Sequence, residues 1–224
     1  MNSRTPNALG HYLGMEGQEY FRWQDRLGTW SGVWNARFFQ AEIHPTDSVL
    51  DFGCGAGHLL AALTAGHKVG VEVNPAARQA ALHYGLQLVP SLTQVDGTPF
   101  DVVISCHALE HVPTPLDTLI GLRSRLRTDG RLVLLLPLDD WRSADQRRYH
   151  VDDVNMHLHC WTPQALGNLL RAAEFRSVKV RIVTRAFPPR GDFLWGIGRP
   201  VFEAAATLAA MLKRRRQLLA VATR

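Results

Sequence analysis

The sequence contains few cysteines, and no two of them are close together. The three, Cys54, Cys106 and Cys160, are an odd number at wide spacing. This pattern excludes a disulfide framework and a zinc site built on thiolates, because both need cysteines at short, paired spacings. We therefore expect a protein of a reducing compartment, the cytoplasm.

Long apolar runs are also missing. The longest nearly apolar stretch, Ala204 to Leu212, is about half of the roughly 20 residues that a helix needs to cross a bilayer. Arg4 is not followed by the apolar segment of a secretory signal. We expect neither a membrane span nor a signal. The 224 residues, 46% hydrophobic and 20% charged, favour one globular domain with additions.

Acidic residues are scarce in the second half of the chain. Residues 1–119 carry 6 basic and 11 acidic side chains, a net charge of −5, whereas residues 120–224 carry 19 basic and 9 acidic, a net charge of +10. A basic half attracts nucleic acid, anionic lipid or an anionic substrate, and it is also compatible with a solvated surface that has no partner.

Aromatic residues are concentrated near the N-terminus, where residues 1–47 hold 8 of the 19. Trp30, Trp34 and Phe38 stand at positions i, i+4 and i+8, which places three rings on one face of a helix. We expect an N-terminal helical cap over residues 1–47. It either packs onto the main domain or closes over a substrate pocket as a lid.

Short apolar runs alternate with amphipathic stretches from residue 48 onward. Repeated alternation of strands and helices predicts an α/β domain with a doubly wound, seven-stranded, mostly parallel sheet. Strands are expected at residues 48–52, 68–73, 86–89, 100–106, 131–137, 177–185 and 217–224. Helices are expected at residues 59–65, 74–84, 115–127 and 162–173.

Two additions interrupt the main domain, which we expect to span residues 48–224. Residues 138–161 form a long polar stretch, interpreted as an acceptor loop or lid because loops of this length are usually functional. Residues 187–216 form a helical insertion before the last strand. Its helix at 200–214 ends in a basic cluster, which either lies on an anionic membrane or caps a helix packed over the sheet edge.

The first strand runs directly into a glycine-rich turn, GCGAG at residues 53–57. Glycines let the chain turn tightly and let a ligand approach the backbone, and the next helix begins with free N–H groups. The turn therefore predicts a nucleotide-like ligand. His58 stands where the dinucleotide pattern GxGxxG has its third glycine, and Asp51 precedes the turn by two residues, so the pattern here is a different one.

VLDFGCGAG at 49–57 and FDVVISCHALEHV at 100–112 resemble two motifs of the class I S-adenosylmethionine (SAM) dependent methyltransferases. The resemblance covers about residues 47–185 and the terminal strand. It implies a Rossmann-like methyltransferase fold, SAM as cofactor and S-adenosylhomocysteine as product. Together with RLVLLLP and NMHLHCWTPQALGNLL, it extends to bacterial members of unassigned acceptor, some associated with surface-glycan synthesis. The usual AGF reads AEF here, with Glu174 in place of glycine.

The resemblance also implies which residues hold the cofactor. Glu72, 21 residues after Asp51, matches the carboxylate that accepts both ribose hydroxyls. Ser91 and Leu92 follow the third strand, where the family meets adenine, although the aspartate common there is absent. The implied set is Asp51, Gly53, Cys54, Gly55, Gly57, Glu72, Val73, Asn74, Ser91, Leu92, Cys106 and His107.

Methyl transfer is an in-line displacement at an activated carbon, so the protein aligns the acceptor and takes a proton from it if it is a hydroxyl. Histidine is the usual base near neutral pH. The resemblance places Glu110 and His111 where a Glu–His pair touches the reaction centre in cyclopropane-forming relatives. Our hypothesis is that His111 or His157 is the base; the alternative is that these histidines only anchor a loop. The candidates are His107, His111, His150, His157 and His159.

A metal site from His157, His159 and Asp152 is conceivable, but we expect no metal. The acceptor expected is an oxygen or nitrogen of a small molecule or glycan precursor. A nucleic-acid acceptor is disfavoured because the (D/N)PP(Y/F) signature of DNA amino-methylating enzymes is missing. A SAM-binding partner or sensor without catalysis is the alternative function.

Overall fold

The computed structural model describes residues 10–138, 148–151, 153, 155–183, 188–212 and 216–224. Its centre is a seven-stranded sheet in the order β3-β2-β1-β4-β5-β7-β6. Only β7 is antiparallel to its neighbours, so the expected doubly wound, mostly parallel sheet is confirmed. The strands are β1 (Ser48–Phe52), β2 (His67–Val71), β3 (Gln87–Val89), β4 (Phe100–Cys106), β5 (Leu126–Pro137), β6 (Arg176–Val183) and β7 (Gln217–Thr223).

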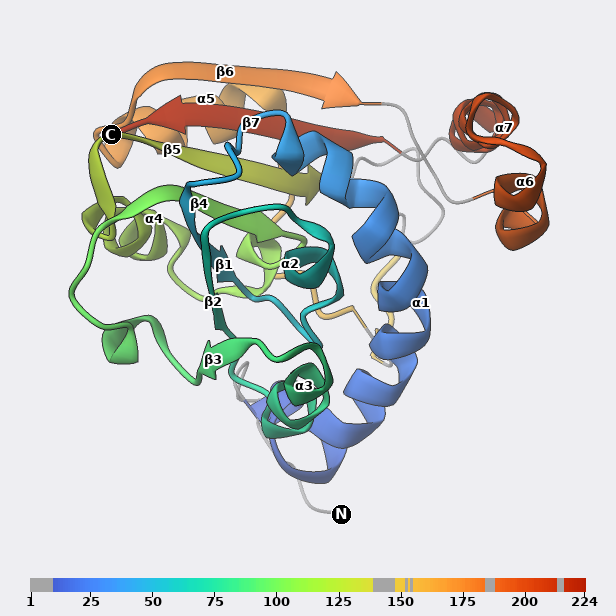
Figure 1. The fold of residues 1–224 in the computed structure, drawn as a ribbon, viewed down its shortest axis with the longest axis horizontal. Coiled ribbons are helices and arrows are strands. Elements are labelled where there is room, and N and C mark those ends of the chain that lie inside the picture. The colour runs from blue at the N-terminus through green and yellow to red at the C-terminus, as the bar shows by residue number, and fades with distance from the viewer. Residues whose placement is uncertain (1–9, 139–147, 152, 154, 184–187, 213–215) are drawn as a thin grey trace.

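The helices surround this sheet (Figure 1). Two of them begin with a side-chain cap at positions 74 and 162, where the sequence predicts the start of a helix: the Asn74 side chain accepts a hydrogen bond from Ala76 N–H and the Thr162 hydroxyl accepts one from Ala165 N–H. The α-helices are α1 (Gly14–Gln40), α2 (His58–Ala62), α3 (Pro75–Ala81), α4 (Pro115–Ser124), α5 (Pro163–Ala172), α6 (Gly191–Ile197) and α7 (Arg199–Leu212). Short 3-10 turns are η1 (Gly10–Tyr12), η2 (Leu82–Tyr84), η3 (Leu92–Gln94) and η4 (Leu109–His111).

Several expected boundaries were wrong: the strand expected at 131–137 begins at Leu126, the helix expected at 59–65 ends at Ala62, and the strand expected at 68–73 ends at Val71. The helix predicted to reach residue 127 ends at Ser124, because Leu126 already pairs with Phe100 and starts β5. The helix α6 was not expected at all, since its seven residues contain two glycines and show little helical signal.

Successive residues of the central strands face opposite sides of the sheet, so both faces are buried. One face packs against α1 and α2 through a cluster that includes Phe39, Leu60, Val102 and Val133. The other face packs against α4 and α5 through Leu119, Leu170, Val103 and Leu134. This leaves the carboxyl ends of the parallel strands for a site.

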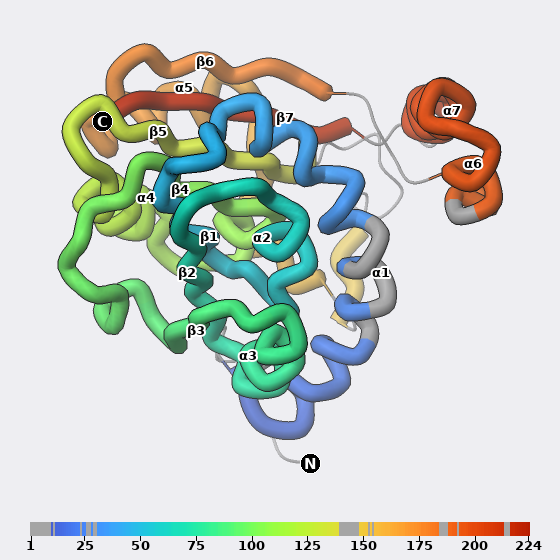
Figure 2. Tube along the Cα trace, in the orientation of Figure 1, coloured from blue at the N-terminus to red at the C-terminus, as the bar shows by residue number. Residues whose placement is uncertain are grey.

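The helix α1 runs along those carboxyl ends, as the ribbon and the tube both show (Figure 1, Figure 2). Asn74 Nδ2 donates to the carbonyl oxygen of Gly17 at 2.8 Å, and Asn35 Nδ2 lies 3.8 Å from Cys106 Sγ at the end of β4. In the predicted aromatic stripe, Trp34 and Phe38 pack against neighbouring residues, whereas the Trp30 side chain lies outside the described residues.

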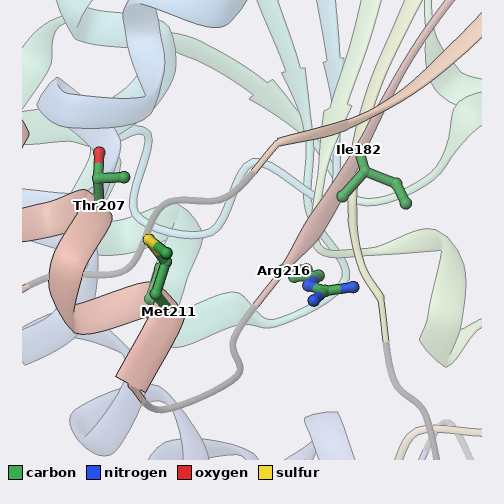
Figure 3. A pocket seen from close by; sticks show the side chains of 5 residues that line it. Ile182, Thr207, Met211 and Arg216 are labelled. Atoms are coloured by element: carbon green, nitrogen blue, oxygen red, sulfur yellow. The ribbon is translucent and has the colours of Figure 1, made fainter.

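The helical insertion stands beyond the end of the sheet, beside α1 (Figure 1). Phe202 of α7 is buried against Trp34, with ring centroids 5.5 Å apart, and Arg37 pairs with Glu203. The helix therefore packs on α1, not over the sheet edge. A pocket of about 480 Å³ separates α7 from the ends of β6 and β7; Figure 3 shows its lining residues Ile182, Thr207, Met211 and Arg216.

No helix in the described part of the chain is long and apolar enough to cross a bilayer. Within the polar stretch 138–161, residues 139–147, 152 and 154 lie outside the described residues. Residues 213–215 of the basic cluster lie outside them as well. The division into a cap of residues 1–47 and a domain of residues 48–224 stays a prediction.

Candidate active site

The glycine-rich turn is held in a shape that side chains do not fit. Gly53 and Gly57 have φ of 74° and 80°, in the left-handed region. A Cβ atom on Gly53 would lie 2.4 Å from the Cβ of Ala108. The N–H groups of Gly53 and Cys54 both donate to the carbonyl oxygen of Val71, so the turn is fixed beside the end of β2.

Asp51 lies under this turn with its carboxylate buried. Neither carboxylate oxygen accepts a hydrogen bond from any described residue. Burial, with a further contribution from the charge of Glu72, raises the pKa of Asp51 to about 8. A buried carboxylate without a partner is unfavourable, so a cationic group of a ligand would stabilise it.

Glu72 joins the turn to the end of β2. Its Oε2 accepts a hydrogen bond from Gly55 N–H at 2.9 Å, and its Oε1 accepts one from Asn74 N–H at 2.8 Å. Burial raises the pKa of Glu72, while these hydrogen bonds and Arg78 oppose the rise. The Arg78 guanidinium also donates to the carbonyl oxygens of Glu72 and Val73.

Two cysteines and two residues after β3 also belong to the set expected to contact the cofactor. Burial raises the pKa of the Cys54 and Cys106 thiols, which keeps both protonated and unsuited to act as nucleophiles. The hydroxyl of Ser91 lies 2.7 Å from that of Thr93, and Leu92 packs against the core. These contacts leave the adenine assignment of Ser91 and Leu92 as a prediction.

A second group of residues gathers around turn η4, after β4. Glu110 is fully buried there. His107 Nδ1 lies 3.4 Å and His111 Nε2 3.9 Å from Glu110 Oε1. His107 has φ of 52°, and its Nε2 lies 2.9 Å from Gln217 Nε2 at the start of β7.

The segment after residue 155 returns to this turn and brings His157 with it. The N–H groups of Leu158 and His159 both donate to the carbonyl oxygen of Glu110, and His159 Nε2 lies 2.9 Å from the carbonyl oxygen of Val112. The ring of His157 therefore lies 5.0 Å from that of His111. His150, in contrast, is exposed.

The electrostatics of the cluster follow from its burial. Burial alone would raise the pKa of Glu110, but contacts with His107 and His111 hold it below its usual value. Burial lowers the pKa of His111 although Glu110 opposes the shift, so His111 is neutral near pH 7.

The structure adds residues that the sequence did not single out for this site. The Tyr12 ring lies 5.8 Å from His111 and 5.1 Å from Tyr20. Burial raises the pKa of both phenols, and the charges of Glu110 and Glu72 contribute to each shift. Tyr12 therefore packs against the histidine cluster, and Tyr20 packs against Tyr12. Pairs separated by about 100 residues, such as His107 and Gln217, leave no local signal in the sequence.

Comparison with known proteins shows the family to which the chain belongs. A family model described as "Methyltransferase domain" matches residues 23–180. A tRNA U34 carboxymethyltransferase of Shewanella sp. (strain W3-18-1) is 36% identical over 122 residues, which cover 47% of this chain and 36% of that protein. The match thus spans about a third of the length of this curated relative.

Solved structures agree on the fold. A chain from the Haloferax volcanii complex of the Trm112 methyltransferase activator with a protein described as a methyltransferase superposes with a TM-score of 0.68. It is 19% identical, and the match covers 92% of this chain and 97% of that one. The plantazolicin methyltransferase BpumL, solved with S-adenosylhomocysteine, gives a TM-score of 0.64 at 16% identity, covering 96% and 94%.

The chain belongs to the methyltransferase-domain family and is a SAM-dependent methyltransferase of Rossmann-like fold. Its cofactor is SAM. The residues fit this cofactor, because Asp51 is a buried carboxylate that accepts no hydrogen bond from the described residues, and the ammonium group of SAM would stabilise it.

Proposed function

We propose that this protein transfers a methyl group from SAM to an oxygen or nitrogen of a small molecule or glycan precursor. One observation carries the proposal: the glycine turn above Asp51 lies against the turn that leads to the Glu110–histidine cluster, because a Cβ atom on Gly53 would lie 2.4 Å from the Cβ of Ala108. The charges of both carboxylates act on the Cys106 thiol, which ends β4. A donor held at Asp51 would therefore present its methyl group toward the histidines.

On the cofactor side, Asp51 would hold the ammonium group of SAM and Glu72 its ribose hydroxyls. Gly53, Cys54, Gly55 and Gly57 would lie against the amino-acid end, as the resemblance implies. Val73, Asn74, Ser91, Leu92, Cys106 and His107 complete the proposed contacts. When bound, SAM supplies a methyl group activated by the sulfonium.

On the acceptor side, we propose that His111 and His157 activate the acceptor. His107 is held between Glu110 and Gln217, and it would position the Glu110 carboxylate. The phenols of Tyr12 and Tyr20 lie next to this cluster and would close it from the side of α1.

Calorimetric titration with SAM and with S-adenosylhomocysteine tests the cofactor site. We expect micromolar binding that is lost in Asp51→Ala. Methyl transfer is then followed with labelled SAM and with sugar, phenol and amine acceptors. Binding without transfer to any acceptor would favour the non-catalytic partner or sensor, and absence of binding would refute the proposed site.

Transfer RNA is a second candidate acceptor, because the curated relatives are named tRNA U34 carboxymethyltransferases. The basic second half of the chain would suit it. The same labelled assay with bulk tRNA decides between the two classes. If the label enters tRNA with the unchanged protein but not with His111→Ala, tRNA is the acceptor and the small-molecule proposal is wrong.

We also propose that α6 and α7 contact an anionic membrane surface from the cytoplasmic side. Their side chains Phe193, Ile197, Leu208 and Leu212 are apolar and exposed. The sequence continues into Lys213, Arg214, Arg215 and Arg216. Exposed apolar side chains next to cations are typical of interfacial helices.

A further inference from the structure

Glu110, His111 and His157 form a cluster that the methyl transfer described so far does not fully use. Each offers one ligand atom, and these atoms all lie within 4.8 Å of one another. One carboxylate and two imidazoles are a donor set for divalent transition metals. We propose that these three residues bind a divalent metal ion, which holds the acceptor oxygen; the second part rests on the proposed function.

The burial of Glu110 provides an independent observation. The residue is 0% exposed, and neither carboxylate oxygen has a hydrogen-bond partner among the described residues. The neighbouring imidazole nitrogens, at 3.4 and 3.9 Å, stand beyond ordinary hydrogen-bond length. A buried carboxylate without a short hydrogen bond is stabilised further by a cation in direct contact, and a metal ion held between Glu110, His111 and His157 supplies one.

The orientation of His111 suits a metal ligand. Its Nδ1 lies 3.5 Å from the carbonyl oxygen of Met156, which favours the proton on Nδ1 and leaves the Nε2 lone pair toward Glu110. Metal-binding histidines usually donate their other N–H to such a carbonyl or carboxylate, which fixes the ring. The two hydrogen bonds from residues 158 and 159 to Glu110 hold His157 against the same site.

This site differs from the one that the sequence pattern suggests. His159 lies against the carbonyl oxygen of Val112 and does not join His157, and Asp152 lies outside the described residues. The partners of His157 are instead Glu110 and His111, some 46 residues earlier in the chain. Only the fold brings these residues together.

Three protein ligands leave coordination positions for the acceptor. An acceptor hydroxyl bound there loses its proton to solvent, because a metal ion lowers the pKa of a bound oxygen ligand. The oxygen then forms a bond to the methyl carbon while the carbon–sulfur bond breaks, and that bonding pair stays on sulfur. His111 and His157 thus activate the acceptor through the metal ion and not as bases.

The test uses untagged protein, stripped with a chelator and titrated with Co²⁺, whose visible absorption reports coordination. We expect one Co²⁺ per chain, with affinity at least about tenfold weaker in Glu110→Gln and in His157→Ala. His83→Ala is the matched control, because His83 is exposed and lies outside the cluster. Its Co²⁺ affinity should equal that of the unchanged protein.

SAM binding, measured by calorimetry in every variant, separates the two proposals. Co²⁺ binding without SAM binding would refute the proposed function and leave the metal site standing. SAM binding with no Co²⁺ bound, or with Co²⁺ affinity equal in the unchanged protein and His157→Ala, would overturn the metal site. If Glu110→Gln does not fold, the comparison of His157→Ala with His83→Ala decides whether the metal site exists.

Discussion

At the scale of single residues, the site buries two carboxyl groups, Asp51 and Glu110, that accept no short hydrogen bond from the described residues. Asp51 lies near the end of β1, and Glu110 lies in turn η4, which follows the neighbouring strand β4. Burial of these carboxyl groups lowers the free energy of unfolding of the free protein, and binding of a cationic ligand raises it again. Function at this site is therefore linked to stability.

The first prediction concerns Asp51 and pH. The folded protein keeps a proton on Asp51 up to a pKa of about 8, whereas the unfolded chain releases it near pH 4. The folded state thus binds more protons between these values, and its stability falls as the pH rises, by about 1.4 kcal/mol per unit at most from this group.

Asp51→Asn removes that titration. Without cofactor, we expect the variant to lose less stability than the unchanged protein between pH 6 and pH 8, by up to about 2 kcal/mol. Urea unfolding at both pH values measures the difference, and comparing the two proteins cancels the titration of Glu72 and the histidines. An equal loss in both proteins would contradict the buried, protonated carboxylate.

The second prediction concerns Glu174, which stands where the family usually has glycine. Its φ of 63° is in the left-handed region, which costs a side-chain-bearing residue roughly 1 to 2 kcal/mol. Glu174→Gly should raise the free energy of unfolding by about 1 kcal/mol, because the exposed contact with Arg123 that it loses is weak.

Glu174→Ala is the control for this change. It removes the same carboxylate but keeps the Cβ atom in the left-handed conformation, so it should not stabilise. Denaturant unfolding measures the free energy of unfolding of the unchanged protein and both variants. A stabilisation of similar size in both variants would show that the charge of Glu174, and not its backbone conformation, is responsible.

At the scale of elements, the helical insertion depends on its contact with α1. Phe202 is 1% exposed and packs against Trp34. Phe202→Ala should detach α6 and α7 from α1, at a cost of about 3 kcal/mol, and speed hydrogen exchange across residues 199–212. SAM affinity should stay unchanged, because Phe202 belongs to a separate apolar cluster with Trp34 and Ala206.

Leu208→Ala offers the comparison, since Leu208 lies on the exposed side of the same helix. Its exchange rates should match those of the unchanged protein. If Phe202→Ala also leaves exchange unchanged, the insertion is held by contacts other than the Trp34–Phe202 pair.

The elements also show how far the sequence could predict the fold. β1 and β4 have the predicted bounds because their apolar runs end at sharp turns, and α3 and α5 begin at the predicted caps. The glycine turn was also predictable, because GCGAG directly follows the first strand in the sequence. The assembly of the histidine cluster was not predictable in this way, because hydrogen bonds from residues 158 and 159 to Glu110 depend on tertiary packing.

At the scale of the whole molecule, the apolar outer side of α6 and α7 predicts binding to vesicles. The protein should sediment with vesicles that contain anionic lipid and less with neutral ones. Replacing Phe193 and Leu212 together by serine should weaken binding about tenfold or more, because each exposed side chain would otherwise be buried in the interface.

Leu82→Ser serves as the control, because Leu82 is as exposed but lies at the end of α3. Equal sedimentation with neutral and anionic vesicles, or no sedimentation at all, would rule out the proposed membrane contact.

The position of β7 has a consequence for biosynthesis. β7 follows the other six strands of the sheet in sequence, yet it lies between β5 and β6, and within the described part of the chain β6 pairs with β7 alone. During translation, β6 therefore has no partner strand until residues 217–223 have left the ribosomal exit tunnel. Gln217, which contacts His107, arrives in the same step. A nascent chain therefore completes its sheet and gains the contact of Gln217 with His107 together, once β7 has emerged.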